Sequence, residues 1–202
     1  AIEAQAARQP DAVALIWQDA RMSYGDLDRA ANRIAHALRA DGVRPGMLVG
    51  LGTGRGIAHV CGGLGILKAG ACLVMLPMDA PEERLNYILA DTGLRHVVGF
   101  ASGNWPDAVA VIDPAADGHA ETPLGLAASV DRSYVVYTSG TTGQPKGSVN
   151  SLIGLAPGDF LLLNVPATVA PADEPDEIKR KDRRIAGQTS AYEKSSYDRH
   201  FI

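Results

Sequence analysis

The chain has 202 residues, of which 46% are hydrophobic and 21% are charged, and its formal net charge is −4. This composition excludes a largely disordered chain, and the acidic balance argues against nucleic acid or an anionic membrane as the main partner. The sequence contains no apolar run of about 18 residues and no basic stretch leading into an apolar segment, as a signal peptide would have. We therefore expect a cytoplasmic protein without a membrane or nucleic-acid partner.

The first clear helical pattern begins at Ser23. Ser23 and Asp26 form a Ser-x-x-Asp start signal, and apolar residues follow at helical spacing as far as Leu38. Asp41-Gly42 then ends the helix. A second helix is predicted from Ile57 to Leu67 and a third between Pro81 and Gly93.

Short apolar runs between these helices predict buried strands. The predicted strands are residues 47–51, 71–76, 96–100, 109–112 and 134–137. Residues 113–130 are predicted to form a loop. Strands that are apolar throughout and alternate with helices are typical of an α/β fold, in which a mainly parallel sheet is flanked by helices on both faces.

The character of the chain changes after Gly147. From Pro171 onward it holds 7 acidic and 7 basic residues in 32 positions, too polar for a core. We therefore divide the chain into a partial domain at 1–165 and a polar, flexible C-terminal tail at 166–202, with one short helix expected at 175–186. The basic run 179–184 is balanced by the acidic residues before it, which favours a solvated tail over a nucleic-acid patch.

The cysteines and histidines predict no disulfide and no metal site. Cys61 and Cys72 lie in separate apolar runs, which indicates buried free thiols. The histidines lie far apart, without the spacing of metal ligands. They are His36, His59, His96, His119 and His200.

The most informative string runs from Tyr137 to Gly147 and reads Tyr-Thr-Ser-Gly-Thr-Thr-Gly-Gln-Pro-Lys-Gly. Its glycines let backbone N–H groups converge on an anion, its hydroxyls donate to phosphate oxygens, and its lysine adds a flexible charge. A strand that feeds such a loop is the usual setting for a phosphate site, and we expect residues 138–147 to leave the end of the strand as an exposed loop. It is not a Walker A loop, because Pro145 precedes Lys146. The alternative is a polar surface turn without a ligand.

This string is similar to the signature of the adenylate-forming superfamily. Residues 22–35 resemble the opening motif of nonribosomal peptide synthetase adenylation domains, and residues 67–71 with 77–85 resemble their second motif. The resemblance covers about residues 1–147, and residues 148–202 match none of the family's downstream segments. The chain therefore looks like the N-terminal part of an AMP-binding adenylation domain, truncated after the phosphate-loop motif.

The resemblance implies an enzyme that joins a carboxylic acid, usually an amino acid, to AMP from ATP with Mg²⁺, and releases pyrophosphate. The acyl group would then pass to a carrier-protein domain, if the chain is part of a longer synthetase. The resemblance identifies no catalytic residue and no metal ligand in this chain, and we expect the chain to be inactive alone. The phosphate contacts that it implies are Thr138, Ser139, Gly140, Thr141, Thr142, Gly143, Lys146 and Gly147.

Two other functions remain open, a non-catalytic remnant that keeps weak nucleotide-phosphate binding and an interaction module. A second glycine-rich stretch, Val49–Gly56, lacks the spacing of a dinucleotide loop and is predicted to be a strand-to-helix turn. Trp17 and Trp105 are interpreted as packing residues.

Overall fold

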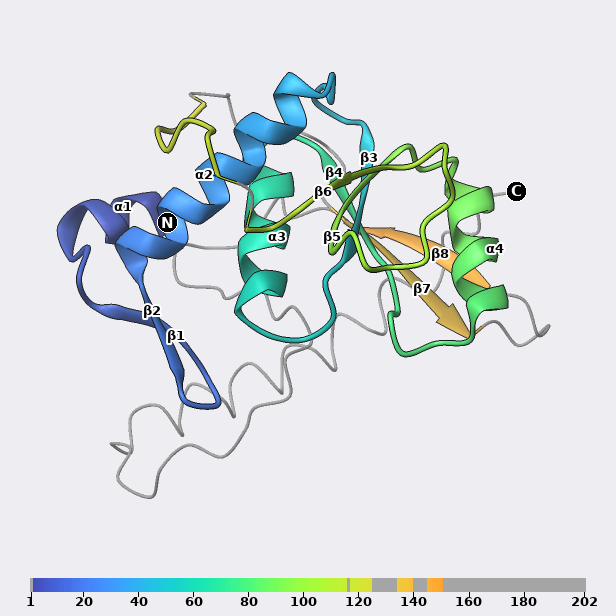
Figure 1. The fold of residues 1–202 in the computed structure, drawn as a ribbon, viewed down its shortest axis with the longest axis horizontal. Coiled ribbons are helices and arrows are strands. Elements are labelled where there is room, and N and C mark those ends of the chain that lie inside the picture. The colour runs from blue at the N-terminus through green and yellow to red at the C-terminus, as the bar shows by residue number, and fades with distance from the viewer. Residues whose placement is uncertain (1, 116, 125–133, 140–144, 151–202) are drawn as a thin grey trace. The chain divides into compact units, whose positions relative to one another are not determined.

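A computed structural model describes residues 2–115, 117–124, 134–139 and 145–150 (Figure 1). The helices in these residues are α1 (Ile2–Arg8), α2 (Tyr24–Ala40), α3 (Ile57–Lys68) and α4 (Glu82–Thr92). The strands are β1 (Val13–Trp17), β2 (Ala20–Ser23), β3 (Leu48–Gly52), β4 (Cys72–Met75), β5 (His96–Gly99), β6 (Ala110–Ile112), β7 (Tyr134–Ser139) and β8 (Pro145–Asn150).

Six strands form one sheet in the order β6-β5-β3-β4-β7-β8. The first five of these are parallel, and β8 is antiparallel to β7. The helices α2 and α3 cover one face and α4 covers the other (Figure 1). The predicted α/β class, with a mainly parallel sheet flanked by helices, is confirmed.

Side chains from alternate positions of the strands enter two separate parts of the core. On one face Leu73 and Val98 pack with α2 and α3. On the other face Val74 and Val135 pack with α4. Because both faces are covered, the strands are apolar at nearly every position, which is the pattern on which the sequence prediction depended.

The start of α2 follows the predicted capping signal. The Asp26 backbone N–H donates to Ser23 Oγ at 3.1 Å, and the Ser23 hydroxyl donates to Asp26 Oδ2 at 2.6 Å. The hydrogen bond from Ser23 is the main reason why the pKa of Asp26 is lowered. The helix ends with Asp41 as its C-cap, also as predicted.

The elements before Ser23 were not predicted. The strands β1 and β2 form an antiparallel hairpin in which Trp17 pairs with Ala20 and Gln18 has a φ of 51°. This turn lacks the Asn-Gly or Gly-containing sequence that identifies most two-residue hairpins. Leu15 and Met22 pack against the core that includes α2 and α3, so tertiary burial stabilises the hairpin.

Lys68, the last residue of α3, connects three helices. Its Nζ donates to Glu3 of α1, to Asp28 Oδ1 of α2 at 2.9 Å and to Asn32 Oδ1 of α2 at 2.8 Å. Asn32 Nδ2 donates in turn to the Glu121 backbone carbonyl at 2.6 Å. The Lys68 and Asp28 side chains are 14% and 16% exposed. We call this group of residues the Lys68 cluster.

The remaining sequence predictions divide by location. Cys61 and Cys72 are both buried thiols, as predicted. The described residues between 113 and 124 contain no helix or strand, as expected for a loop. The domain boundary at residue 165, the short helix at 175–186 and the polar tail lie outside the described residues. None of the helices in the described ranges has the length and apolar character needed to cross a membrane.

Candidate phosphate-binding site

In the hairpin formed by β7 and β8, the end of β7 and the start of β8 lie at the carboxyl edge of the sheet. Val135 of β7 pairs in parallel with Val74 of β4, so β7 runs in the same direction as β3, β4 and β5. The carboxyl ends of these strands therefore meet at one edge. Ligands of open α/β sheets bind at this edge, where the loops leave the strands.

The register of the hairpin brings the two halves of the predicted phosphate loop together. Thr138 pairs with Lys146, and Ser139 pairs with Pro145. Lys146 and Gly147 are exposed. The other predicted phosphate contacts lie outside the described residues; they are Gly140, Thr141, Thr142 and Gly143.

The expectation that residues 138–147 leave the sheet as one exposed loop is wrong at both ends. β7 continues to Ser139, and the chain returns as β8 from Pro145. Proline and glycine have low β propensity, and for this reason the sequence did not predict β8. Proline is nevertheless tolerated as the first residue of an edge strand, and β8 is such a strand.

Lys146 supplies the positive charge of the hairpin. No described residue forms a salt bridge with it, and its side chain is exposed at the position opposite Thr138. A lysine ammonium on a flexible stem suits a phosphate group, to which it binds as a point charge. The described part of the site can thus attract an anion that lies at the end of the hairpin.

Tyr137 connects the hairpin to α4. Its hydroxyl donates to Asp91 Oδ2 in the last turn of that helix. Burial, followed by the bond to Asp91, raises the pKa of Tyr137, so the phenol keeps its proton at neutral pH. The sequence predicted no role for Tyr137, because its partner lies 46 residues earlier in the chain.

The second glycine-rich stretch is a strand-to-helix turn between β3 and α3, as predicted. Gly54 and Gly56 have φ values of 67° and 134°, which favour glycine. Thr53 Oγ1 lies 3.2 Å from His59 Nδ1. Burial lowers the pKa of His59, so its ring is neutral at pH 7 and offers no charge to a phosphate.

A hollow of about 190 Å³ lies beside this turn. The residues that line it follow β3, β4 and β5: Gly52, Thr53, Gly54, Met78, Phe100, Ser102 and Gly103. None of these lining residues is charged. Trp105 fills the space that side chains at Gly52 and Gly99 would occupy, and its Nε1 donates to the Phe100 carbonyl at 2.9 Å. It is a packing residue, as predicted.

These features define an α/β protein whose parallel sheet carries, at its carboxyl edge, a hairpin with glycine, hydroxyl and lysine residues. The family described as "AMP-binding enzyme" matches residues 2–153. The chain belongs to this family.

Its relatives include large peptide synthetases. Chondramide synthase cmdD of Chondromyces crocatus is 37% identical over 161 residues, which cover 73% of this chain and 4% of that protein. Phosphinothricin tripeptide synthetase PhsC of Streptomyces viridochromogenes is 40% identical over 158 residues, which cover 72% of this chain and 14% of that protein. The chain therefore spans a small part of the length of these relatives.

Solved structures show the same fold. The nonribosomal peptide synthetase FmoA3 superposes with a TM-score of 0.68 at 32% identity, over 74% of this chain and 16% of that one. The N-terminal subdomain of Klebsiella oxytoca NpsA superposes with a TM-score of 0.64 over 74% of this chain and 40% of that one. Its 23% identity supports the fold alone.

Proposed function

We propose that the chain carries the ATP-phosphate-binding part of an adenylation domain in nonribosomal peptide synthesis. The reaction activates a carboxylic acid, with an amino acid as the main candidate, as an acyl-adenylate. The observation that carries this proposal is the hairpin register, which places Lys146 opposite Thr138 at the carboxyl edge of the sheet. The family match over residues 2–153 supports it, and an FmoA3 structure is described as an AMPPNP-bound form.

In the proposed reaction the acid's carboxylate oxygen attacks the α-phosphorus of ATP. The bond from that phosphorus to the oxygen bridging to the β-phosphate breaks, and pyrophosphate leaves with the electron pair. Lys146 would offset the charge of the β- and γ-phosphates. The other predicted contacts would hold these phosphates through backbone N–H and hydroxyl groups; they are Thr138, Ser139, Gly140, Thr141, Thr142, Gly143 and Gly147. Catalysis of this kind depends on positioning and on stabilisation of developing charge.

Mg²⁺ would enter the site as a companion of the ATP substrate. The described residues contain no group of three histidine, cysteine, aspartate or glutamate side chains that could hold a metal ion. Mg²⁺ is commonly bound by substrate phosphates with only one or two carboxylates.

The partner that follows from this proposal is a carrier-protein domain, whose thiol would accept the acyl group. A second candidate function is phosphate binding without turnover. It is favoured by the end of the family match at residue 153, soon after the phosphate hairpin.

The binding site can be tested by titrating the chain with ATP and with pyrophosphate in a calorimeter. Lys146→Ala should weaken pyrophosphate binding about tenfold or more, since a hydrogen bond to a charged group contributes about 1.5–3 kcal/mol. Arg55→Ala is a matched control, because it removes another exposed positive charge from the turn between β3 and α3. It should leave the affinity unchanged.

A larger loss of pyrophosphate affinity in Arg55→Ala than in Lys146→Ala would indicate that phosphate binds at the β3–α3 turn instead. Exchange of labelled pyrophosphate into ATP, with a panel of amino acids, then tests whether the chain adenylates by itself. Amino-acid-dependent exchange supports adenylation by this chain. Pyrophosphate binding without exchange is expected both for the phosphate-binding part of an adenylation domain and for the second candidate, and the absence of any binding by the folded parent chain would exclude both.

A further inference from the structure

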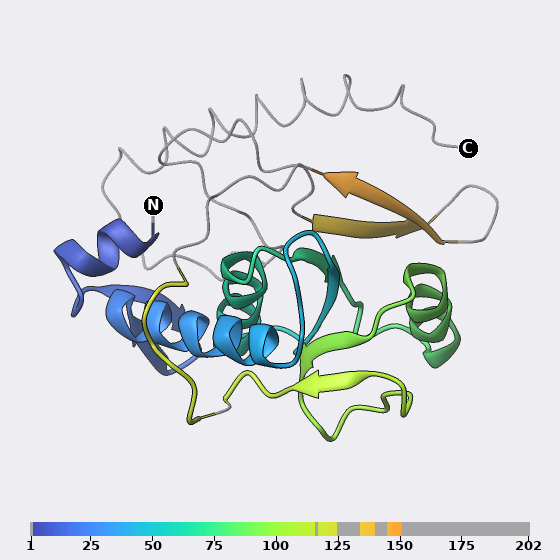
Figure 2. The same ribbon diagram turned by 90° about the horizontal axis from the view of Figure 1, so that it is seen from above.

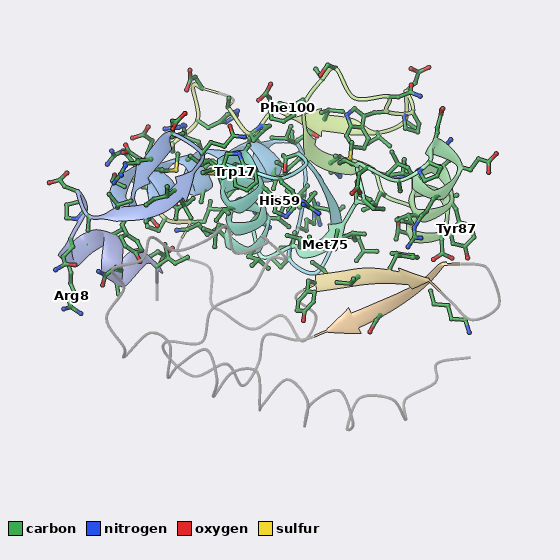
Figure 3. The ribbon with its side chains drawn as sticks, turned by 90° about the horizontal axis from the view of Figure 1, so that it is seen from below. Arg8, Trp17, His59, Met75, Tyr87 and Phe100 are labelled. Carbon is green, nitrogen blue, oxygen red and sulfur yellow. The ribbon has the colours of Figure 1, made fainter. Side chains whose placement is uncertain are left out.

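The phenol of Tyr137 is placed between two elements that are far apart in the sequence. It donates to Asp91 in the last turn of α4. Tyr87 of the same helix packs with Tyr137 against one core cluster, and Figure 3 shows Tyr87 on the side of α4 nearest the hairpin. Figure 2 shows the hairpin and α4 side by side. The hairpin is thus attached to α4 as well as to β4.

The same ring also lies against the second strand of the hairpin. Tyr137 pairs directly with Gly147 in the antiparallel register. A Cβ atom at Gly147 would lie 3.1 Å from Tyr137 Cζ and 3.3 Å from its hydroxyl oxygen. The absence of a side chain at residue 147 therefore leaves room for the phenol over β8.

Asp91 occupies a position that a helix alone would not favour. A carboxylate near the C-terminus of a helix is repelled by the partial negative charge of the unpaired carbonyl groups. The last turn of α4 contains no basic residue that could offset this repulsion. The phenol hydroxyl of Tyr137 donates a hydrogen bond to this carboxylate. This hydrogen bond offsets the unfavourable position of Asp91 at the end of the helix.

We propose that Tyr137 is a positioning residue: its phenol, held by Asp91 and seated over Gly147, fixes the β7–β8 hairpin against α4. Thr138 and Lys146, the next pair in the register, are thereby held in place for phosphate contact. This role rests on the proposed function for its ligand, but the anchoring of the hairpin can be measured without one.

The test uses the full chain with Tyr137→Phe, Asp91→Ala and the pair combined. Tyr137→Phe keeps the ring and removes only the hydroxyl. Two properties are measured: hydrogen-exchange protection of the backbone amides of β8, and pyrophosphate affinity. Each single variant should lower the protection of β8 and should weaken pyrophosphate affinity about threefold to tenfold. The double variant should show no larger loss than either single variant, because both substitutions remove the same hydrogen bond.

Two further variants separate positioning from general loss of stability. Asp91→Asn keeps an acceptor oxygen and should restore most of the protection and affinity that Asp91→Ala loses. Gly147→Ala should lower both properties in the parent chain, because its Cβ displaces the phenol. In a Tyr137→Ala background, where no ring is present to be displaced, Gly147→Ala should cause little further loss of β8 protection.

Unchanged protection and affinity in Tyr137→Phe would overturn the proposal. A lower melting temperature with both properties unchanged would also overturn it, since the hydroxyl would then contribute only to global stability. If the parent chain binds no pyrophosphate while Tyr137→Phe lowers the protection of β8, the proposed function fails and the anchoring of the hairpin by Tyr137 stands.

Discussion

The ring of His59 lies close to the turn between β3 and α3. Its Nδ1 is 3.2 Å from Thr53 Oγ1, and Thr53 is itself buried. Burial penalises the charged imidazolium and lowers the pKa of His59 from the ordinary value of 6.5. The folded protein therefore prefers the neutral ring, and this preference links stability to pH.

We expect the free energy of unfolding to fall in acid because of His59. Above pH 6.5 the ring is neutral in both states, and its contribution is constant. As the pH falls from 6.5 towards the lower folded pKa, the unfolded chain binds a proton that the folded chain does not, so stability decreases. His59→Gln should reduce this slope in urea-unfolding curves measured across that range. A variant that keeps the full slope would show that other groups cause it.

At the scale of single residues, the sequence predicts candidate phosphate contacts but not the residues that support them. Lys146 and Gly147 are candidates because glycine, hydroxyl and lysine residues at short spacing suit a phosphate group. Tyr137 and Asp91 were not identified, because their relation exists only after α4 and β7 have packed on the same sheet. No local pattern indicates such a pair.

At the scale of elements, α2 and α3 approach each other closely at Gly65. A Cβ atom there would lie 2.5 Å from Ile34 Cγ2 and 3.1 Å from the Ala31 carbonyl oxygen. Both distances are too short for a side chain unless the helices move apart. Gly65 therefore determines how closely α3 can pack against α2.

Gly65→Ala should destabilise the protein although alanine is the better helix former. The gain in helix propensity is about 1 kcal/mol, whereas overpacking of a core costs about 1–3 kcal/mol. We expect a net decrease in the free energy of unfolding, measured by urea titration. Adding Ile34→Ala should make the combined loss smaller than the sum of the two single losses. Increased stability of Gly65→Ala would show that the helices separate at little cost.

The elements that were predicted share strong local signals. α2 has a capping residue and apolar spacing, and β3 to β7 are short apolar runs. β8, α1 and the β1–β2 hairpin lack such signals: Pro145 and Gly147 disfavour strands, α1 has 7 residues, and Gln18 is an unusual turn residue. Tertiary contacts stabilise these elements despite their weak local preferences, and such contacts cannot be recognised in a single sequence.

At the scale of the whole molecule, the Lys68 cluster joins four segments of the chain. Glu3, Asp28, Lys68 and Glu121 come from α1, α2, α3 and the segment that follows β6. The charges at its centre are largely buried. Loss of Lys68 would leave Asp28 and Asn32 without their shared donor.

Lys68→Met should therefore lower the free energy of unfolding by about 1.5–3 kcal/mol, because it removes the charged partner of the partly buried Asp28 carboxylate. Glu3→Gln is the matched comparison, since the Glu3 side chain is 54% exposed. It should cost less than about 1 kcal/mol, as exposed ion pairs do. Urea-unfolding curves of both variants test this difference. Equal losses would indicate that the contact with Glu3, rather than the buried pair, dominates the Lys68 cluster.

The neighbour of β7 in the sheet is β4, and not β6, which precedes it in the chain. Val135 pairs with Val74, about 60 residues earlier. Pairing across this loop costs more chain entropy than the pairings among β3 to β6, so we expect it to follow them during folding. The ribosome also delivers the β7–β8 hairpin after every strand on which it docks. The hairpin would then be assembled on a sheet edge that already exists.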